Sequence, residues 1–457
     1  MKKPVNIDFA DKGVDIDASL ASATRVERLT GISVASDDVS EDSLATAFSE
    51  QYSETLKFCQ SSRRWFNWNG MYWVKHDGNF AIHRLRVFLR HFTGGRKEHC
   101  KAARIKAIEG LVCESPAHAV NSRHWDQNLF LLGTPEGVVN LGNGDLVKPK
   151  PSWAITKVTA IAPSSGYPES WLRFLHDATS DDAAMIRYIQ QICGYALTGS
   201  TKEHALFFVC GPGGNGKSVF LSTVSGILGD YARVASMETF TASKNDRHPT
   251  ELAMLQGARL VTASETEEGR AWAESKIKQL TGSDPISARF MRQDFFEFTP
   301  QFKLIIVGNH APQLRAVDEA LKRRFNILPF THKPSKPDRD LEAKLKKEWP
   351  QILNWMIEGC IDWQANGLIK PAAVVEATNE YFEQQDLFGQ WVTEWCQHGP
   401  TFQETPKALF ENWSIFARQN GEDVGNSKAF AAALKRHGFS SYRTGGVRYW
   451  RGIQLRR

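Results

Sequence analysis

A glycine-rich loop that contains one lysine is the part of this chain best suited to hold phosphate groups. Residues 211–218 read Gly-Pro-Gly-Gly-Asn-Gly-Lys-Ser, which satisfies the pattern G-x-x-x-x-G-K-[ST]. Glycines let backbone N–H groups converge on phosphate oxygens, while the lysine reaches the outer phosphates and the serine a magnesium ion. An apolar strand (205–210) and a helical segment (219–228) flank the loop, whereas a chance glycine-rich turn needs neither. The residues expected to hold ATP are Gly211, Pro212, Gly213, Gly214, Asn215, Gly216, Lys217, Ser218 and Val219, with Lys217 catalytic and Ser218 a magnesium ligand.

A carboxylate follows a second apolar segment. Residues 260–265, Leu-Val-Thr-Ala-Ser-Glu, predict a buried strand that ends at Glu265. We expect Glu265 to act as general base and magnesium ligand, because ATP hydrolysis requires a group that holds the metal and polarises water. Many such sites place two acidic residues here, whereas this chain has Ser264 before a single glutamate, and Ser264 could hold a magnesium-bound water. Glu267 is an alternative, and Glu267 and Glu268 could instead be solvated loop charges.

A third apolar segment ends in an amide. Residues 303–309 read Lys-Leu-Ile-Ile-Val-Gly-Asn, and an asparagine in this position can orient the attacking water and report the nucleotide state. Its structural alternative is a turn residue ahead of Pro312. We expect Asn309 to be a catalytic sensor.

Two adjacent arginines precede a fourth apolar segment. Arg323 and Arg324 stand just before the strand expected at 327–330. A basic pair is usually a solvated surface, but here it could stabilise charge on a neighbouring subunit's γ-phosphate, as an arginine finger does. We assign a catalytic role to the pair and leave open which of the two is the finger.

These residues need a scaffold that brings strand ends together. Strand and helix patterns alternate from 205 to about 330, which predicts an α/β fold with a parallel sheet and crossover helices. Two glycine turns, at Asn69-Gly70 and Asn143-Gly144, predict hairpins upstream of this core. One basic helical stretch is expected from about 83 to 111. The expected division is a flexible lead-in (1–45), an aromatic-rich α+β domain (46–168), a helical collar (169–200), the α/β core (201–332), a helical extension (333–387) and a basic winged-helix-like domain (388–457).

Composition narrows the class of protein. The 457 residues are 42% hydrophobic and 23% charged, as in ordinary globular chains, and no apolar run is long enough to predict a membrane span. The chain does not begin with an apolar signal, so a cytoplasmic protein is expected. None of the seven cysteines forms a C-x-x-C pair, which argues for scattered reduced thiols rather than zinc.

Charge is distributed unevenly along the chain. The net charge is only +5, yet residues 424–457 contain no Asp or Glu and many Lys and Arg. A basic helix (427–436) followed by a hairpin at Gly445-Gly446 indicates a winged helix, a fold often used to bind DNA. A winged helix used for protein contact is the alternative. The candidate DNA contacts in this segment are Lys435, Arg436, Arg443 and Arg448.

With these motifs in this order, the sequence resembles the superfamily 3 helicases. It is most similar to the branch of phage, satellite-phage and plasmid primase-helicases and of the poxvirus uncoating helicase. The similarity extends beyond the phosphate loop to residues 135–144, 191–199, 352–359 and 380–386, and covers about 400 residues. Asp15-Ile-Asp17 lacks the further ligands of a primase site, so no primase domain is expected.

The resemblance implies a modified AAA+ core, hexameric rings around single-stranded DNA and 3′-to-5′ translocation. It also implies a DNA-gripping hairpin between Glu265 and Asn309, and the alternation near residues 289–298 supports a hairpin with Arg292 near its tip. Surface charge beside core aromatics is the alternative for any single residue there. The candidate contacts are Lys276, Lys278, Arg289 and Arg292.

The function expected from the sequence is an ATP- and magnesium-dependent DNA helicase that replicates a phage, prophage, satellite or plasmid. Its expected partners are single-stranded and forked DNA, other copies of the chain, and a separate primase or polymerase. Two alternatives remain. An origin-binding or loading ATPase would remodel DNA without processive unwinding, and a non-enzymatic protein would carry a degenerate phosphate loop.

Overall fold

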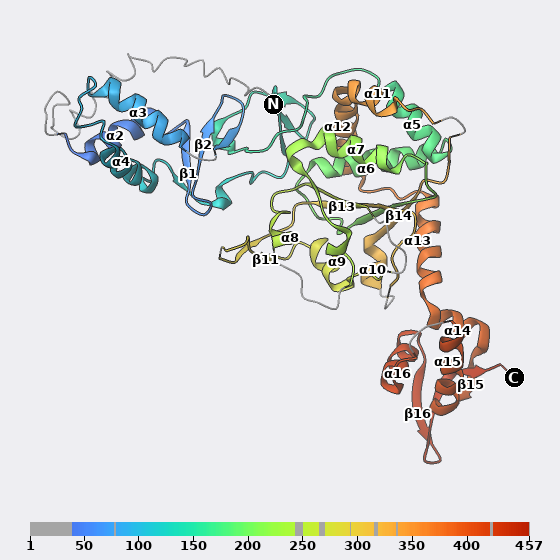
Figure 1. Ribbon diagram of the computed structural model, residues 1–457. Coiled ribbons are helices and arrows are strands. Elements are labelled where there is room, and N and C mark those ends of the chain that lie inside the picture. The colour runs from blue at the N-terminus through green and yellow to red at the C-terminus, as the bar shows by residue number, and fades with distance from the viewer. Residues whose placement is uncertain are drawn as a thin grey trace, which may run out of the picture.

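The computed structural model describes residues 39–76, 79–242, 250–264, 270–292, 294–314, 319–334, 337–420 and 424–456. We refer to residues 39–125 as the N-terminal part, 126–385 as the central part and 386–456 as the C-terminal part. Figure 1 shows the N-terminal part beside the central part, and the C-terminal part at the end of helix α13 (Ala372–Gln385). The expected lead-in 1–45 lies largely outside the described residues, and α2 already begins at Glu41.

The N-terminal part consists of three helices packed beside a four-stranded sheet in the order β3-β2-β1-β4. The expected hairpin at Asn69-Gly70 is confirmed, because β2 and β3 pair antiparallel on either side of that turn. The basic helical stretch expected from 83 to 111 consists of two helices, α3 and α4, separated by residues 93–101, where consecutive left-handed glycines interrupt the helix. The elements are α2 (Glu41–Tyr52), β1 (Leu56–Cys59), β2 (Arg64–Trp68), β3 (Trp73–His76), α3 (Phe80–Phe92), α4 (Ala102–Glu114) and β4 (Ala119–Val120).

The central part begins with a three-stranded sheet, which is followed by two helices. Strands β6 and β7 pair across the expected turn at Asn143-Gly144. The collar expected from Ser170 is confirmed as two helices, of which α6 packs on α12. These elements are β5 (Leu131–Thr134), β6 (Gly137–Asn140), β7 (Leu146–Val147), α5 (Glu169–Thr179), α6 (Ala183–Leu197), α11 (Leu341–Lys347) and α12 (Trp349–Asn366).

The centre of the molecule is a five-stranded sheet in the order β14-β8-β13-β10-β9, in which every neighbouring pair is parallel. Four of its strands, all but the edge strand β9, are buried on both faces, which explains their continuous apolar sequences. Alternate residues of β8 show this, because Phe207 packs in the core formed with α6, α7 and α12, and Phe208 in the core formed with α9 and α13. The parallel α/β core predicted from sequence is therefore confirmed. Its strands are β8 (Leu206–Cys210), β9 (Ala232–Val234), β10 (Leu260–Ser264), β13 (Lys303–Gly308) and β14 (Phe325–Pro329), and its helices are α7 (Lys217–Leu228), α8 (Thr250–Ala253), α9 (Glu274–Leu280) and α10 (Glu319–Arg324).

Two buried cations occupy the amino edge of this sheet. Lys303, at the start of β13, is 1% exposed and donates to the carbonyl oxygens of Thr198, Ser200 and Gln301. Arg259, just before β10, is 3% exposed and donates to carbonyl oxygens at the end of α6 and in the segment 128–131 that enters from the N-terminal part. Lys303 lies over the ring of Tyr195, and Arg259 lies over the ring of Tyr231. Both cations thus bind the last carbonyls of α6, where positive charge is favourable.

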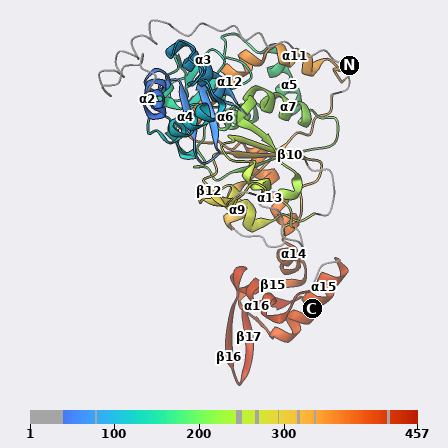
Figure 2. The ribbon, with the colours of Figure 1, turned by 60° about the vertical axis from the view of Figure 1, so that its left-hand side comes forward.

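The C-terminal part has three helices and a three-stranded antiparallel sheet in the order β15-β17-β16. The predicted hairpin at Gly445-Gly446 is confirmed as β16 and β17. A third strand, β15, pairs with the other side of β17 and was not predicted, because its sequence is polar and contains Gly399 and Pro400. Figures 1 and 2 both show this part standing away from the central sheet. The elements are α14 (Leu387–Trp395), β15 (Cys396–Glu404), α15 (Pro406–Gln419), α16 (Ser427–Arg436), β16 (Ser440–Thr444) and β17 (Val447–Leu455).

Three further features concern the cysteines, metal ligands and membrane spans. All seven cysteines are free thiols, as expected. Within the described ranges, no group of three or more His, Cys, Asp or Glu side chains is placed to hold a metal ion. No helix among the described residues is long and apolar enough to cross a membrane.

Candidate functional site

The phosphate-loop pattern lies at the carboxyl end of β8, between that strand and α7. Gly211, Gly214 and Gly216 all have positive φ, so the loop takes a path that other residues rarely adopt. Space also requires glycine: a Cβ at Gly211 would lie 1.9 Å from the Phe330 carbonyl oxygen, and one at Gly216 2.4 Å from the Phe174 ring. The loop is therefore a tight cradle that leads directly into the amino end of a 12-residue helix.

Lys217 is held inside this cradle by the loop itself. Its Nζ donates to the carbonyl oxygens of Gly211 (2.7 Å) and Pro212 (3.1 Å) and to Asn215 Oδ1 (2.9 Å). The side chain is 7% exposed, and this burial lowers the pKa of the lysine. Asn215 in turn donates to the Phe330 carbonyl, which ties the loop to the end of β14. None of the three acceptors is a carboxylate, so a phosphate could replace them as the ammonium's partner at little cost.

A cavity of about 220 Å³ opens next to Asn215 and Gly216. Aromatic and charged side chains of α5 and of the segment before α11 line it together with the loop. Beside it, Lys344 forms an ion pair of 2.5 Å with Asp338, which lowers the pKa of that carboxyl. The sequence analysis did not predict this wall, because it assigned residues 169–200 only to a helical collar. The lining side chains are Ser170, Arg173, Phe174, Asp177, His332, Pro334, Asp338, Leu341 and Lys344.

The other predicted catalytic residues of the sheet come from neighbouring strand ends. Gly308 of β13 pairs with Cys210 of β8, so the exposed Asn309 follows at the edge from which the loop starts. Ser264 ends β10, which pairs with β13 on its other side, and is exposed. Glu265, Glu267 and Glu268 lie outside the described residues. The carboxyl ends of parallel strands are where open α/β sheets bind ligands.

The arginine pair lies at the opposite edge. Arg323 and Arg324 end α10 immediately before β14, whose first residue pairs with Leu206 at the start of β8. Five residues of strand, roughly 16 Å, separate them from the phosphate loop of their own chain. Arg324 is half-buried and donates to the Ala320 carbonyl (2.8 Å), whereas Arg323 is exposed. The fold therefore does not bring the pair to the loop within one chain.

Comparison with known proteins gives two family matches. Residues 45–180 match the family described as "D5 N terminal like", and residues 209–324 match the "Family of unknown function (DUF5906)". The chain is 25% identical over 296 residues to a "putative helicase" of Acanthamoeba polyphaga mimivirus, covering 59% of this chain and 31% of the relative. It is 26% identical over 244 residues to a "putative helicase" of Frog virus 3, covering 48% of this chain and 25% of that relative. It is also 23% identical over 343 residues to a "putative primase" of African swine fever virus, covering 68% and 35%.

Together these matches support the phage and viral primase-helicase family for this chain. The chain spans about a third or less of the length of the first two of these relatives and 35% of the third. The fold also has a solved counterpart, the apo C-terminal region of NrS-1, with a TM-score of 0.50 at 11% identity, covering 88% of this chain and 96% of that one.

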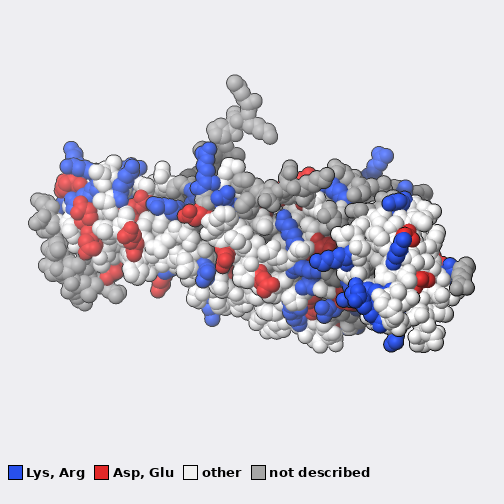
Figure 3. All heavy atoms as spheres, turned by 90° about the horizontal axis from the view of Figure 1, so that it is seen from below, with Lys and Arg blue, Asp and Glu red and all other residues white. Residues whose placement is uncertain are grey.

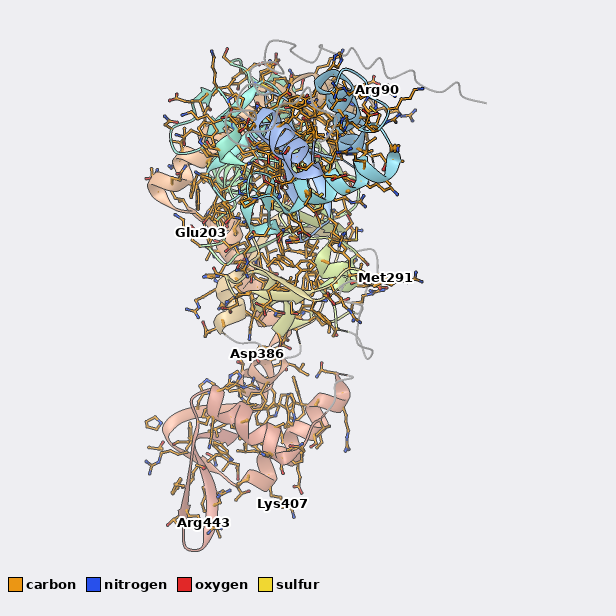
Figure 4. All side chains as sticks on the ribbon, turned by 90° about the vertical axis from the view of Figure 1, so that its left-hand side faces the viewer. Arg90, Glu203, Met291, Asp386, Lys407 and Arg443 are labelled. Carbon is orange, nitrogen blue, oxygen red and sulfur yellow. The ribbon has the colours of Figure 1, made fainter. Side chains whose placement is uncertain are left out.

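The hairpin predicted between Glu265 and Asn309 is confirmed. Strands β11 (Ile286–Ala288) and β12 (Phe296–Phe298) pair antiparallel, and the described residues of the tip between them are 289–292, 294 and 295. The tip exposes hydrophobic side chains, with Met291 68% and Phe295 59% exposed, and Arg289 lies over the Phe295 ring. Figure 4 shows Met291 at the outer rim of the central part. Arg292 belongs to this tip, whereas Lys276 and Lys278 lie on α9, half-buried and before the hairpin.

The C-terminal part presents the predicted cations on one helix end and one hairpin. Lys435 and Arg436 are exposed in the last turn of α16. Arg443 and Arg448 are exposed and lie directly opposite each other in the β16–β17 ladder. Like charges in that arrangement repel each other, so an anion between them would relieve a cost that the free protein carries. Figure 4 places Arg443 near the tip of this hairpin, and Figure 3 shows Lys and Arg gathered over this end of the molecule.

Proposed function

We propose that this chain is an ATP-driven DNA helicase with an AAA+ core and a C-terminal winged helix. The observation that carries the proposal is the glycine cradle around Lys217, whose ammonium has only carbonyl and amide oxygens as partners. A polyphosphate is the ligand that such a cradle favours. The adjoining 220 Å³ cavity offers Phe174 for contact with the base of a nucleotide. Ser218 and Glu265 would hold a magnesium ion, which when bound would neutralise charge on the phosphates.

Hydrolysis would need a second copy of the chain. Asn309 and Ser264 lie at the same sheet edge as the loop, and can orient water there, but the arginine pair is at the far edge. Arg323 is the better finger, because it is exposed and donates to the Glu319 carbonyl only at 3.3 Å, whereas the half-buried Arg324 donates to the Ala320 carbonyl at 2.8 Å. We therefore propose a ring, expected to be hexameric, in which each arginine serves the neighbouring subunit's nucleotide.

The DNA would be held at the hairpin tips. Exposed aromatic side chains beside arginines suit single-stranded DNA, since bases stack on the rings while cations meet phosphates. The opposed Arg443 and Arg448 suit a phosphate backbone. Translocation would run 3′ to 5′. The setting would be replication of a phage, prophage, satellite or plasmid in a host cytoplasm, alongside a separate primase or polymerase.

Strand displacement from a forked duplex tests this proposal. The wild-type chain should displace the strand with ATP and magnesium, and Lys217→Ala should not, while both bind the fork equally. A fork with only a 3′ tail should be unwound and one with only a 5′ tail should not. Displacement by Lys217→Ala at the wild-type rate contradicts the mechanism.

The second candidate is an origin-binding or loading ATPase, which the large basic surface of the C-terminal part favours. It predicts ATP hydrolysis stimulated by DNA without strand displacement on any fork. The same assay, followed by phosphate release, separates the two functions.

A further inference from the structure

Helix α3 divides the charges of the N-terminal part into two faces. From residue 79 to residue 97 the chain contains no Asp or Glu, while the other two helices of this part carry Glu41, Asp42, Glu50, Glu109 and Glu114. Both ribbon views show α3 along the upper side of this part, with α2 and α4 below it. The basic face is therefore presented to solvent and the acidic residues lie elsewhere.

Three basic side chains of α3 form one stripe. His83, Arg86 and Arg90 are exposed and recur at helical spacing, opposite Leu85 and Phe88, which are buried in the core of this part. Lys97, which follows the helix, is also exposed. Within the described residues, none of these four side chains forms an ion pair or hydrogen bond. Figure 4 shows Arg90 at the outer rim of the molecule.

Two features of the stripe select a type of nucleic acid. Residues 83–90 span about 10 Å at 1.5 Å per residue, along which a duplex presents roughly one charge per 1.7 Å of axis. No Phe, Tyr or Trp is strongly exposed on α3, since the aromatic rings of this helix are buried or half-buried. Single-strand sites rely on stacking platforms, as the tip of the β11–β12 hairpin offers, so this stripe lacks what a single strand requires.

We propose that the α3 stripe, made of His83, Arg86 and Arg90, together with Lys97, binds the phosphate backbone of duplex DNA without reading its sequence. The chain then holds duplex DNA on the N-terminal part, and this goes beyond the single-strand grip and the C-terminal surface of the proposed helicase. The interaction requires no nucleotide, so it does not depend on ATP hydrolysis.

Binding of a blunt 20-bp duplex, measured without nucleotide between 50 and 200 mM salt, tests the inference. Arg86→Gln with Arg90→Gln should lower the slope of log K against log salt by about 2, because each phosphate contact contributes about 1. Affinity near 100 mM salt should fall roughly 10-fold or more. Binding of a single-stranded oligonucleotide should stay at the wild-type value. Arg86→Lys with Arg90→Lys should restore duplex binding, since contacts with phosphate need a positive charge and do not need the planar guanidinium group.

A matched control removes the same charge elsewhere. Lys148→Gln with Lys347→Gln replaces two exposed lysines outside the proposed DNA surfaces and should leave the slope unchanged. Equal unfolding midpoints for both double variants exclude misfolding as the cause. The inference is overturned if the α3 variant keeps the control's slope and affinity, or if single-strand binding falls as much as duplex binding. Loss of unwinding in Lys217→Ala has no bearing on either outcome.

Discussion

Two lysines of the central sheet have similar partners and opposite roles. Lys217, at the carboxyl edge, and Lys303, at the amino edge, are both buried and both donate to backbone carbonyl oxygens rather than to a carboxylate. The partners of Lys217 belong to its own glycine-rich loop, beside a cavity, whereas those of Lys303 belong to the end of α6 and to the approach to β13. A buried lysine is thus a candidate ligand-binding group only when its partners can be exchanged.

The largest effect on stability should come from replacing Lys303. Lys303→Met would leave three carbonyl oxygens without this donor, and we expect the free energy of unfolding to fall by about 3 kcal/mol or more. Urea denaturation at pH 7 measures it. Lys217→Met is the matched control and should change the unfolding free energy by less than about 1 kcal/mol, because its partners belong to its own loop and join no distant segments of the chain. Equal losses in both variants would erase the distinction.

The activity should show the reverse order. Lys217→Met is expected to lower DNA-stimulated ATP hydrolysis by about 100-fold or more, the usual loss when one donor to the reacting charge is removed. Lys303→Met, assayed at a temperature where it stays folded, should retain turnover within a few-fold of wild type. Phosphate release under saturating ATP provides the measurement, and comparable losses would contradict the assignment.

A smaller effect is expected from the neighbouring arginine. Arg259→Lys keeps the charge but cannot reach the Leu197, Asn128 and Leu131 carbonyls with one ammonium, so unfolding should cost about 1–2 kcal/mol less. Hydrogen exchange should rise in residues 128–134 before it rises in β8. Uniform exchange across the sheet would show that Arg259 does not tie this segment to the core.

The smallest effect concerns pH. Burial, and then the charge of Arg259, lower the pKa of Lys303 well below its ordinary value in the folded chain. The unfolded chain therefore binds more protons than the folded one as pH rises toward the ordinary lysine pKa, and stability should increase in that direction. From pH 7 to 10, the urea midpoint of the wild type should rise relative to that of Lys303→Met. A difference between the two midpoints that stays constant or moves the other way contradicts this linkage.

The two lysines also mark what a sequence can predict. Lys217 was identified because glycine spacing specifies a loop conformation, and the hairpins at Gly70, Gly144 and Gly445 were found for the same local reason. Lys303 looked like an ordinary strand end, since its partners lie about 100 residues away along the chain. The polar strand β15 and the cavity wall at Phe174 were missed because tertiary pairing, and not periodicity, defines them. The predicted sites at Glu265 and Glu267 stay predictions.

Strand β10 gains a mechanical meaning from its two ends. Arg259, just ahead of it, grips the segment 128–131 that comes from the N-terminal part, and Ser264, its last residue, opens onto the edge where the phosphate loop lies. Because β10 is hydrogen-bonded to β9 and β13 along its length, these two places are held at a fixed separation by one strand of the central sheet.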